Sequence, residues 1–158
     1  LIGTVGSKEK ADLAKKNGCE YIINYKEENV VEVVNEITGG AGVPVVYDGV
    51  GRDTFEASLG CLSKRGMLVS FGQSSGMVPS INLHKVFSPK NLFYTRPSLI
   101  IYNEKREDLL KSSSDLFKMI ELGKIKTNIY KKYKLEDVAK AHKELQMRKT
   151  SGSLVLKP

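Results

Sequence analysis

The fold is decided by the stretch LIGTVGSKEKADLAKKNGCEYIINY at residues 1–25. Its β-branched opening predicts a strand, and Ser7 is placed to cap a following helix that is rich in Lys, Ala and Leu. The dipeptide Asn17-Gly18 is typical of a helix end, and the run Tyr-Ile-Ile at 21–23 predicts a second strand. A strand, a helix and a second strand at this spacing predict a right-handed unit whose two strands run parallel.

The same alternation continues beyond residue 25. Further strands are expected at 44–47, 67–71 and 92–95, and helices at 29–37, 53–62 and 83–87. The apolar run at 44–47 is of the kind that is buried on both faces of a parallel sheet. The rest of the sequence predicts a long helix capped by Asn103, an extended segment at 131–135, a helix at 136–148 and a strand at 154–156. We therefore expect one α/β domain over residues 1–158.

The composition is that of an ordinary globular chain: 158 residues, of which 41% are hydrophobic and 27% are charged. The net charge of +7 comes from lysines interspersed with acids. Because the sequence has no basic stripe with interleaved aromatics, we expect no nucleic-acid partner. No apolar run approaches the ~18 residues that a membrane span needs, so we expect no membrane partner either.

The cysteines and histidines form no recognisable redox or metal motif. Cys19 and Cys61 are too few for a disulfide framework, and we expect both to be buried apolar side chains of a cytoplasmic protein. His84 and His142 are far apart in the sequence, and we expect the first at the surface and the second in the core. The sequence therefore predicts no metal site, zinc included.

A set of short motifs is spread over the whole chain. In chain order they are IGTVGSxxK from Ile2, INY from Ile23, ITGG from Ile37, VYDxVG from Val46, GxLVxFG from Gly66, TRPSL from Thr95 and AHxxL from Ala141. Together they resemble the quinone oxidoreductases, the zinc-free and NADPH-dependent, zeta-crystallin-like branch of the medium-chain dehydrogenase/reductase family. The resemblance implies a Rossmann-type doubly wound parallel sheet.

The resemblance also implies that this sheet is incomplete. Members of the branch are about twice as long and carry a GroES-like catalytic domain, whereas this chain is expected to begin at the second Rossmann strand. It would then lack the first strand and the Gly-rich loop, since neither Gly40-Ala41-Gly42 nor Gly49-Val50-Gly51 meets the order of strand, G-x-G-x-x-G and helix. The missing strand is central in the order 3-2-1-4-5-6. We therefore expect the strands at 1–5 and 43–47 to pair directly, or the segment 153–156 to lie between them.

The tip of the first strand carries features of an NADP site. NAD enzymes place an Asp or Glu there for the ribose 2′-hydroxyl, whereas this chain has Gly6 and Ser7, then a helix N-terminus and Lys10. A helix N-terminus attracts phosphate. In the family, the residues that match Ser7, Lys10 and Tyr25 surround the 2′-phosphate and the adenosine. The alternative interpretation is structural: a capping serine, a solvated lysine and a half-buried tyrosine.

Other residues match positions that line the cofactor cleft in the family. They are Val50, Phe71, Gly72, Gln73 and Ser98, together with Arg148 near the end of the last helix. The structural alternative is packing at strand ends and, for Arg148, a favourable cation at a helix C-terminus. We expect no catalytic residue in this chain, because the cofactor itself carries hydride transfer.

The function that the resemblance implies is the cofactor-binding portion of an NADPH-dependent quinone oxidoreductase. The complete enzyme would pass a hydride or electrons from NADPH to a quinone, and we expect this chain to be inactive unless a separate catalytic polypeptide completes it. The resemblance also implies a homodimer through the edge strand from Leu92 to Thr95. The alternative is a non-catalytic folded remnant of a split or truncated gene, with weak or no cofactor binding.

Overall fold

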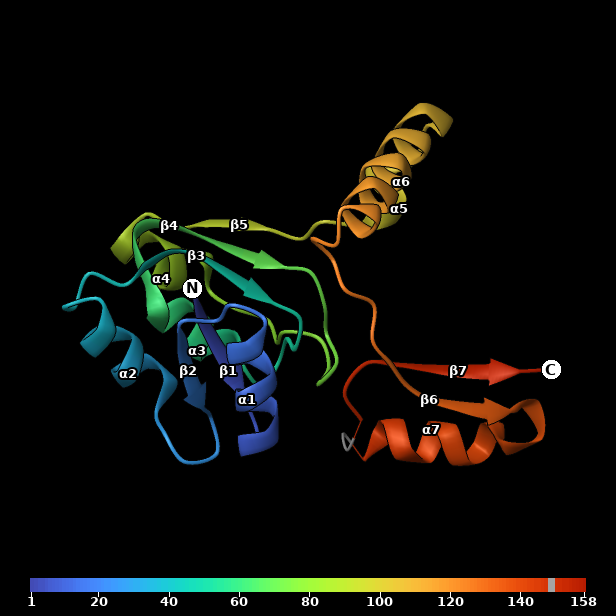
Figure 1. Ribbon diagram of the computed structural model, residues 1–158. Helices are drawn as coiled ribbons and strands as arrows, with labels where there is room; N and C mark the ends of the chain where they lie inside the picture. The colour runs from blue at the N-terminus through green and yellow to red at the C-terminus, as the bar shows by residue number, and fades with distance from the viewer. Residues whose placement is uncertain (148–149) are drawn as a thin grey trace. The chain divides into compact units, whose positions relative to one another are not determined.

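The computed structural model describes residues 1–147 and 150–158, which form two compact units, 1–101 and 102–158. Each unit combines parallel strands with helices (Figure 1). The predicted α/β class is therefore confirmed, and the single domain over residues 1–158 stays a prediction.

Strands and helices alternate along the first unit. Their order is β1 (Ile2–Val5), α1 (Lys8–Lys16), β2 (Tyr21–Asn24), α2 (Val30–Ile37), β3 (Val43–Asp48), α3 (Phe55–Cys61), β4 (Leu62–Ser70), α4 (Leu83–Phe87), the 3-10 turn η1 (Ser88–Lys90) and β5 (Phe93–Thr95). The predicted elements of this unit are confirmed, with bounds that differ by a few residues. The largest difference is at β4, where residues 63–66 bulge out of the ladder with β3 and Arg65 takes a φ of +61°.

Local hydrogen bonds fix where these helices begin and end. Ser7 accepts a hydrogen bond from the backbone N–H of Lys10 at 3.3 Å, and so caps α1 as predicted. Asn29 caps α2 by accepting from two backbone N–H groups of its first turn, at 3.0 and 3.4 Å. At the other end of α1, Gly18 takes a φ of +91°, a conformation that favours glycine and stops the helix.

The strand order is that of a doubly wound sheet with its centre missing. β1 pairs with β2, and β4 lies between β3 and β5, with every pair parallel. The orders β2-β1 and β3-β4-β5 are what remains of the order 3-2-1-4-5-6 when its first strand is removed. The prediction of a Rossmann-type, doubly wound parallel sheet is therefore confirmed, and in the described residues no strand pairs with the free edges of β1 and β3.

The prediction of how the sheet is repaired is wrong in both of its forms. Among the described residues, β1 pairs only with β2 and β3 only with β4. The terminal strand β7 (Ser153–Lys157) pairs instead with β6 (Ile129–Lys134), inside the second unit. Because β6 offers β7 a parallel partner over its whole length, the backbone groups along one edge of β7 are satisfied within the second unit.

Side chains, and not backbone hydrogen bonds, join the two sheets of the first unit. Ile23 of β2, Val34 of α2 and Cys61 of α3 are buried in one apolar cluster. Strands β1 and β3 contribute Ile2 and Val43 to the same cluster. The helix α2 therefore bridges the two sheets by apolar packing, which is favourable in proportion to the area removed from water.

The prediction that residues 44–47 are buried on both faces of the sheet is wrong. Val46 packs against both buried clusters of the unit, the second of which contains Phe55 and Leu68. Tyr47, which points to the opposite face, is 74% exposed. Side chains alternate along a strand, and Val45 and Tyr47, which alternate with Val46, both meet solvent.

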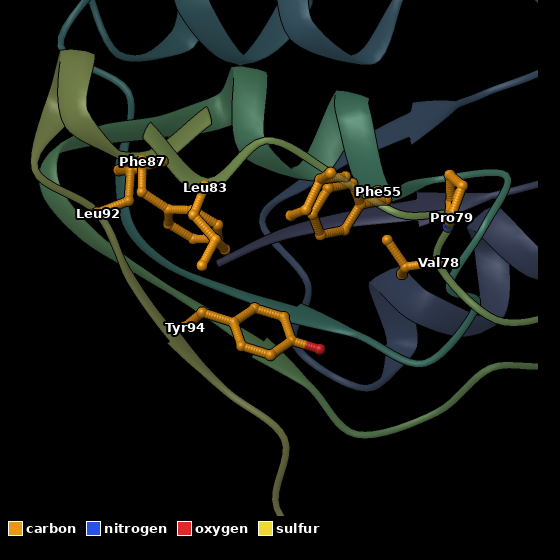
Figure 2. Close-up of a pocket in the computed structure, with 8 residues that line it drawn as sticks. Phe55, Val78, Pro79, Leu83, Phe87, Leu92 and Tyr94 are labelled. Carbon is orange, nitrogen blue, oxygen red and sulfur yellow. The ribbon is translucent and has the colours of Figure 1, made fainter. Parts of the chain in front are cut away.

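An apolar pocket of about 460 Å³ opens beside β5 (Figure 2). It is lined by Phe55, Val78, Pro79, Ile81, Leu83, Phe87, Leu92 and Tyr94. The rings of Phe87 and Tyr94 meet edge to face with their centroids 6.1 Å apart, a favourable aromatic geometry. The side chains that line the pocket are apolar, except that Tyr94 carries a hydroxyl group.

The second unit is a strand pair with one packed helix. It comprises α6 (Arg106–Glu121), β6, the 3-10 turn η2 (Leu135–Asp137), α7 (Val138–Gln146) and β7, and it follows the short helix α5 (Leu99–Tyr102). Tyr133 of β6 is buried, and its hydroxyl donates to Glu144 of α7 at 2.5 Å. Lys131 donates to the same carboxylate at 3.3 Å. These two hydrogen bonds to Glu144 fix α7 against β6.

Two predictions for the second unit are wrong. The long helix α6 begins after Lys105, and Asn103 does not cap it but accepts a hydrogen bond from the hydroxyl of Ser112 at 2.7 Å. His142 is exposed, whereas its neighbour Ala141 is the buried residue of α7. One residue along a helix is a rotation of about 100°, which is enough to move a side chain from the core to solvent.

Lys90 fixes the junction between α3 and β4. Its ammonium group donates to the carbonyl oxygens of Gly60 and Leu62, at 3.0 and 2.6 Å, where the negative end of a helix favours a cation. We expect Lys90→Met to lower the free energy of unfolding by about 2 kcal/mol, the scale of hydrogen bonds to a charged group. Urea denaturation followed by circular dichroism measures the loss. Lys85→Met, at an exposed position of α4, is the control, and equal stability of the two variants would contradict this role.

Candidate functional site

The first group of predicted site residues meets at the carboxyl end of β1. Gly6 and Ser7 follow this strand directly, and Lys10 lies one turn into α1. Residues three apart on a helix share a face, so Ser7 and Lys10 lie on the same side of the first turn. The oxygen of Ser7 accepts from the Lys10 backbone, and its hydroxyl proton remains able to donate.

Tyr25 completes this group from the neighbouring strand. It follows β2, and its backbone N–H donates to the carbonyl of Val5 at 3.1 Å. Its ring lies against Gly6 so closely that a Cβ atom at position 6 would sit 2.7 Å from Cζ of the ring and closer still to the hydroxyl oxygen. A larger residue at position 6 would therefore require the ring to move, and 47% of Tyr25 remains exposed beside the tip of β1.

The charges at this tip suit an anion. The N-terminus of the nine-residue helix α1 carries a partial positive charge, and Lys10 adds a full one. The acidic residue of the first turn, Glu9, is exposed. Positions 5–7, at the strand tip itself, contain no acidic residue. An acid there would repel a 2′-phosphate.

The second group of site residues surrounds the carboxyl ends of β3 and β4. Val50 lies in the turn after β3, and Phe71, Gly72 and Gln73 lie in the loop after β4. The structure brings these four together. A Cβ at Gly72 would sit 2.9 Å from Cα of Gly49, and one at Gly51 would sit 3.1 Å from Cα of Gln73, so the two segments touch backbone to backbone.

Ser98 is connected to this second group only through a neighbouring residue of its segment. Ser98 is partly buried two residues after Arg96, whose guanidinium donates to the side-chain oxygen of Gln73 at 2.9 Å. The segment after β5 therefore reaches the loop after β4 through Arg96. Arg148 lies outside the described residues, so its predicted role stays a prediction.

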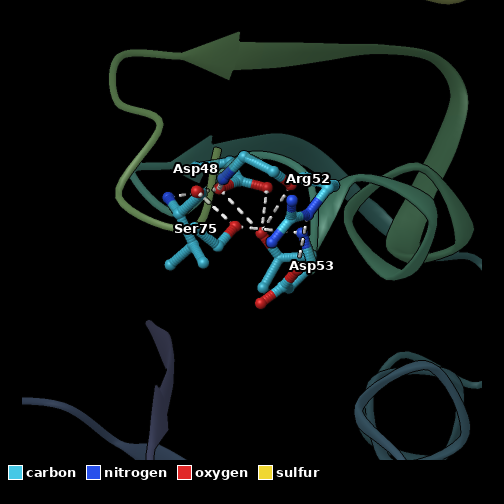
Figure 3. Close-up of polar contacts among 7 residues, drawn as sticks. Asp48, Arg52, Asp53 and Ser75 are labelled. Atoms are coloured by element: carbon cyan, nitrogen blue, oxygen red, sulfur yellow. Dashed lines mark hydrogen bonds and ion pairs between the residues drawn. The ribbon is translucent and has the colours of Figure 1, made fainter. Parts of the chain in front are cut away.

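Asp48, the last residue of β3, organises the turn that contains Val50 (Figure 3). It is 5% exposed, and its carboxylate accepts hydrogen bonds from the backbone N–H groups of Val50 and Gly51 at 2.8 and 3.0 Å. The hydroxyl of Thr54 lies 2.8 and 2.9 Å from its two oxygens, and that of Ser58 donates at 2.7 Å. Every buried acceptor of this carboxylate thus has a donor, as burial requires.

These donors also decide the ionisation of Asp48. Burial alone would raise the pKa of its carboxyl group. The hydrogen bonds donated by Ser58, Gly51, Thr54 and Val50 outweigh that effect and hold the pKa below the ordinary value of 3.8. Asp48 is therefore a carboxylate at neutral pH. Since it already takes the amides of Val50 and Gly51, the Gly49-Val50-Gly51 turn does not present those two amides to a phosphate.

Sequence reasoning gave no role to Asp48, Thr54, Ser58 and Ser75. A signal for part of this network was present, because an Asp at a strand end followed by Gly predicts a turn held by the side chain. Thr54 and Ser58 are four residues apart and therefore share one face of α3 and the turn before it. Ser75 could not be found this way, because it comes from a different strand connection.

A metal centre finds no support in the described part of the chain. Residues 1–147 and 150–158 contain no group of three or more His, Cys, Asp or Glu side chains that could hold a metal ion. His84 is exposed as predicted, with its ring nitrogen 3.1 Å from the hydroxyl of Ser88. The expectation of a zinc-free protein stays a prediction. The same residues form no helix with the length and apolarity that crossing a membrane requires.

A protein-family model described as zinc-binding dehydrogenase matches residues 1–120. The chain belongs to this family. Quinone oxidoreductase 1 of Escherichia coli is 50% identical over 160 residues, which cover all of this chain and 49% of that protein. The 2-haloacrylate reductase of a Burkholderia species is 42% identical, over all of this chain and 48% of that protein. The chain thus spans about half the length of these members of the zinc-binding dehydrogenase family.

Solved structures of family members give the same picture. The structure of Escherichia coli quinone oxidoreductase complexed with NADPH has a TM-score of 0.94 and 50% identity, covering all of this chain and 49% of that one. The quinone oxidoreductase of Pseudomonas syringae pv. tomato DC3000 also gives a TM-score of 0.94, at 44% identity and with the same coverage. The resemblance to quinone oxidoreductases and the Rossmann-like fold are confirmed.

Asp48→Asn tests whether the buried carboxylate holds the turn after β3. The amide keeps one acceptor oxygen and turns an NH₂ group toward donors, so we expect a loss of about 2 kcal/mol in the free energy of unfolding at pH 7. Because the pKa of Asp48 is lower in the folded chain, the carboxylate contributes fully to stability above pH ~4. This contribution is lost as the pH falls through the lowered pKa.

The difference in the free energy of unfolding between the wild type and Asp48→Asn should therefore become smaller below pH ~4. Urea denaturation at a series of pH values measures it. Asp53→Asn, at an exposed position of the same turn, is the matched control and should change stability little. A difference that stays constant from neutral to acid pH would count against the carboxylate as its source.

Proposed function

We propose that the chain binds NADPH as the cofactor-binding portion of an NADPH-dependent quinone oxidoreductase. The observation that carries the proposal is the tip of β1, where Ser7, Lys10 and Tyr25 meet around a strand end without an acid. The similarity to an NADPH-complexed quinone oxidoreductase over the whole chain supports it.

The tip of β1 fits an adenosine 2′-phosphate. The hydroxyl of Ser7 can donate to a phosphate oxygen, the α1 N-terminus favours the anion, and the Lys10 ammonium adds a charge-assisted contact. The half-exposed ring of Tyr25 offers a flat apolar surface beside the same point. The structural roles of Ser7 as cap and Tyr25 as packing partner are present as well, and they leave these groups able to bind.

The second group of residues fits the nicotinamide side of the cofactor. Val50, Gly72 and Gln73 lie at the carboxyl ends of β3 and β4, where open α/β sheets bind ligands. NADPH held there would supply the hydride for reduction of an acceptor. This chain would bind and orient it, and the catalytic surface for the acceptor would come from outside these residues, in the same or a separate polypeptide.

The acceptor that we propose is a quinone. Three relatives at 47 to 50% identity are quinone oxidoreductases, whereas the 2-haloacrylate reductase stands at 42%. The cytoplasmic location and the absence of zinc and of nucleic-acid partners stay predictions of the sequence.

A homodimer through β5 belongs to the same proposal. In the described residues β5 pairs with β4 on one edge only, and Phe93 is 54% exposed. The apolar pocket opens beside this strand, with Leu83 67% exposed at its wall (Figure 2). Exposed apolar surface along a free strand edge favours pairing with a second strand.

Nicotinamide fluorescence during titration with NADPH and NADH tests cofactor binding. We expect binding of NADPH in preference to NADH, and Lys10→Ala should weaken NADPH binding by about tenfold or more, because a charge-assisted contact is lost. Lys16→Ala, at an exposed position on the last turn of α1, should bind as the wild type does. If neither cofactor binds to the wild-type chain, the alternative of a non-catalytic folded remnant is supported instead.

Sedimentation velocity tests the dimer. We expect a dimer for the wild type and a monomer for Phe93→Lys, because a charge at the free edge of β5 blocks strand pairing. Phe117→Lys replaces a similarly exposed ring on α6 and should leave the dimer intact. Dissociation by both substitutions, or by neither, would place the contact elsewhere.

A further inference from the structure

Ser75 ties together two segments that follow different strands. The 49–53 turn comes after β3 and the 72–76 loop comes after β4. The hydroxyl oxygen of Ser75 accepts from the backbone N–H of Asp53 at 3.0 Å and donates to the carbonyl of Val50 at 2.8 Å (Figure 3). One side chain therefore uses both its donor and an acceptor position to join two loops.

Backbone contacts support the same junction. The N–H of Ser75 donates to the carbonyl of Val50 at 2.9 Å, and that of Arg52 donates to the carbonyl of Gly76 at 3.1 Å. Gly51 takes a φ of +90°, and a Cβ there would sit 2.6 Å from the oxygen of Gly76. The two segments are thus in direct contact, with no room for a side chain between them at this point.

The junction is anchored at both ends. On one side, buried Asp48 holds the 49–53 turn through the amides of Val50 and Gly51. On the other side, Arg96 donates to Gln73 of the 72–76 loop at 2.9 Å. Hydrogen bonds therefore tie the end of β3 to the 49–53 turn and that turn to Ser75, and Gln73 of the same loop is tied to the segment after β5.

We propose that Ser75 is a positioning residue that makes the 49–53 turn and the 72–76 loop a single wall of the cofactor cleft. It fixes the spacing between Val50 and Gln73, which face the nicotinamide side of NADPH, without contacting the cofactor itself. The effect on the cofactor rests on the proposed function, whereas the coupling of the two loops does not. Ser75 acts here by preorganisation, because loops already held in the binding geometry lose less freedom when a ligand binds.

Two ligands separate positioning from general stability. NADPH carries both the 2′-phosphate and the nicotinamide, and adenosine 2′,5′-bisphosphate carries the first without the second. In Ser75→Ala, we expect the dissociation constant for NADPH to rise by about fivefold to tenfold, from two lost hydrogen bonds, and that for the bisphosphate to stay within about twofold. Ser75→Thr, which keeps the hydroxyl, should restore NADPH binding. Ser74→Ala, at the exposed neighbouring position, is the matched control.

Hydrogen exchange of the cofactor-free chain tests the coupling independently. Ser75→Ala should speed amide exchange in residues 49–53 and 72–76 together and leave β1 and β2 unchanged. Faster exchange in only one segment, unchanged exchange, or equal weakening of both ligands would overturn the proposal. If the wild type binds neither ligand, the proposed function fails, while the exchange result still decides whether Ser75 couples the two loops.

Discussion

The first unit depends on apolar packing across a place where a sheet would normally have backbone hydrogen bonds. Ile23, Val34 and Cys61 come from a strand and two helices, and their burial in one cluster holds the β1-β2 pair beside the β3-β4-β5 sheet. Packing of this kind is non-directional. It therefore keeps the two sheets together without defining a ladder between β1 and β3, and the helix α2 becomes the element on which the arrangement of the unit depends.

The two parts of the candidate site are built by different physical means. At the tip of β1, a helix cap and the close packing of Tyr25 on Gly6 define the site, so its geometry follows from local contacts. At the ends of β3 and β4, a buried carboxylate and a bridging hydroxyl define it. Buried polar networks fix one geometry because each unpaired member would be costly. The second part is consequently the more rigidly specified of the two.

Much of the fold could be predicted because its signals are local. The cap at Ser7, the helix end at Gly18 and the bounds of α4 each depend on a few neighbouring residues, and all are confirmed. The exposure of Tyr47 could not be predicted, because it depends on which face of the sheet other elements cover. His142 was misplaced because a one-residue error in helical phase reverses burial.

Some contacts of the candidate site could likewise be predicted from the sequence, and others could not. The resemblance implies that Gly6 lies near Tyr25 and Val50 near the loop after β4, and the structure brings each pair together. The contributions of Ser75 and Arg96 were missed, because their partners lie more than twenty residues away in the sequence. Hydrogen bonds of that span carry no periodic signal, and only the folded chain brings their partners together.

The contact between Gly6 and Tyr25 constrains the order in which this chain could change during evolution. An acidic side chain at position 6, the feature that an NAD enzyme uses, has no space while the tyrosine ring lies against the glycine. The half-exposed ring must therefore turn aside or be replaced before an acid can occupy position 6. The effect of a substitution at either of these two positions therefore depends on which residue occupies the other.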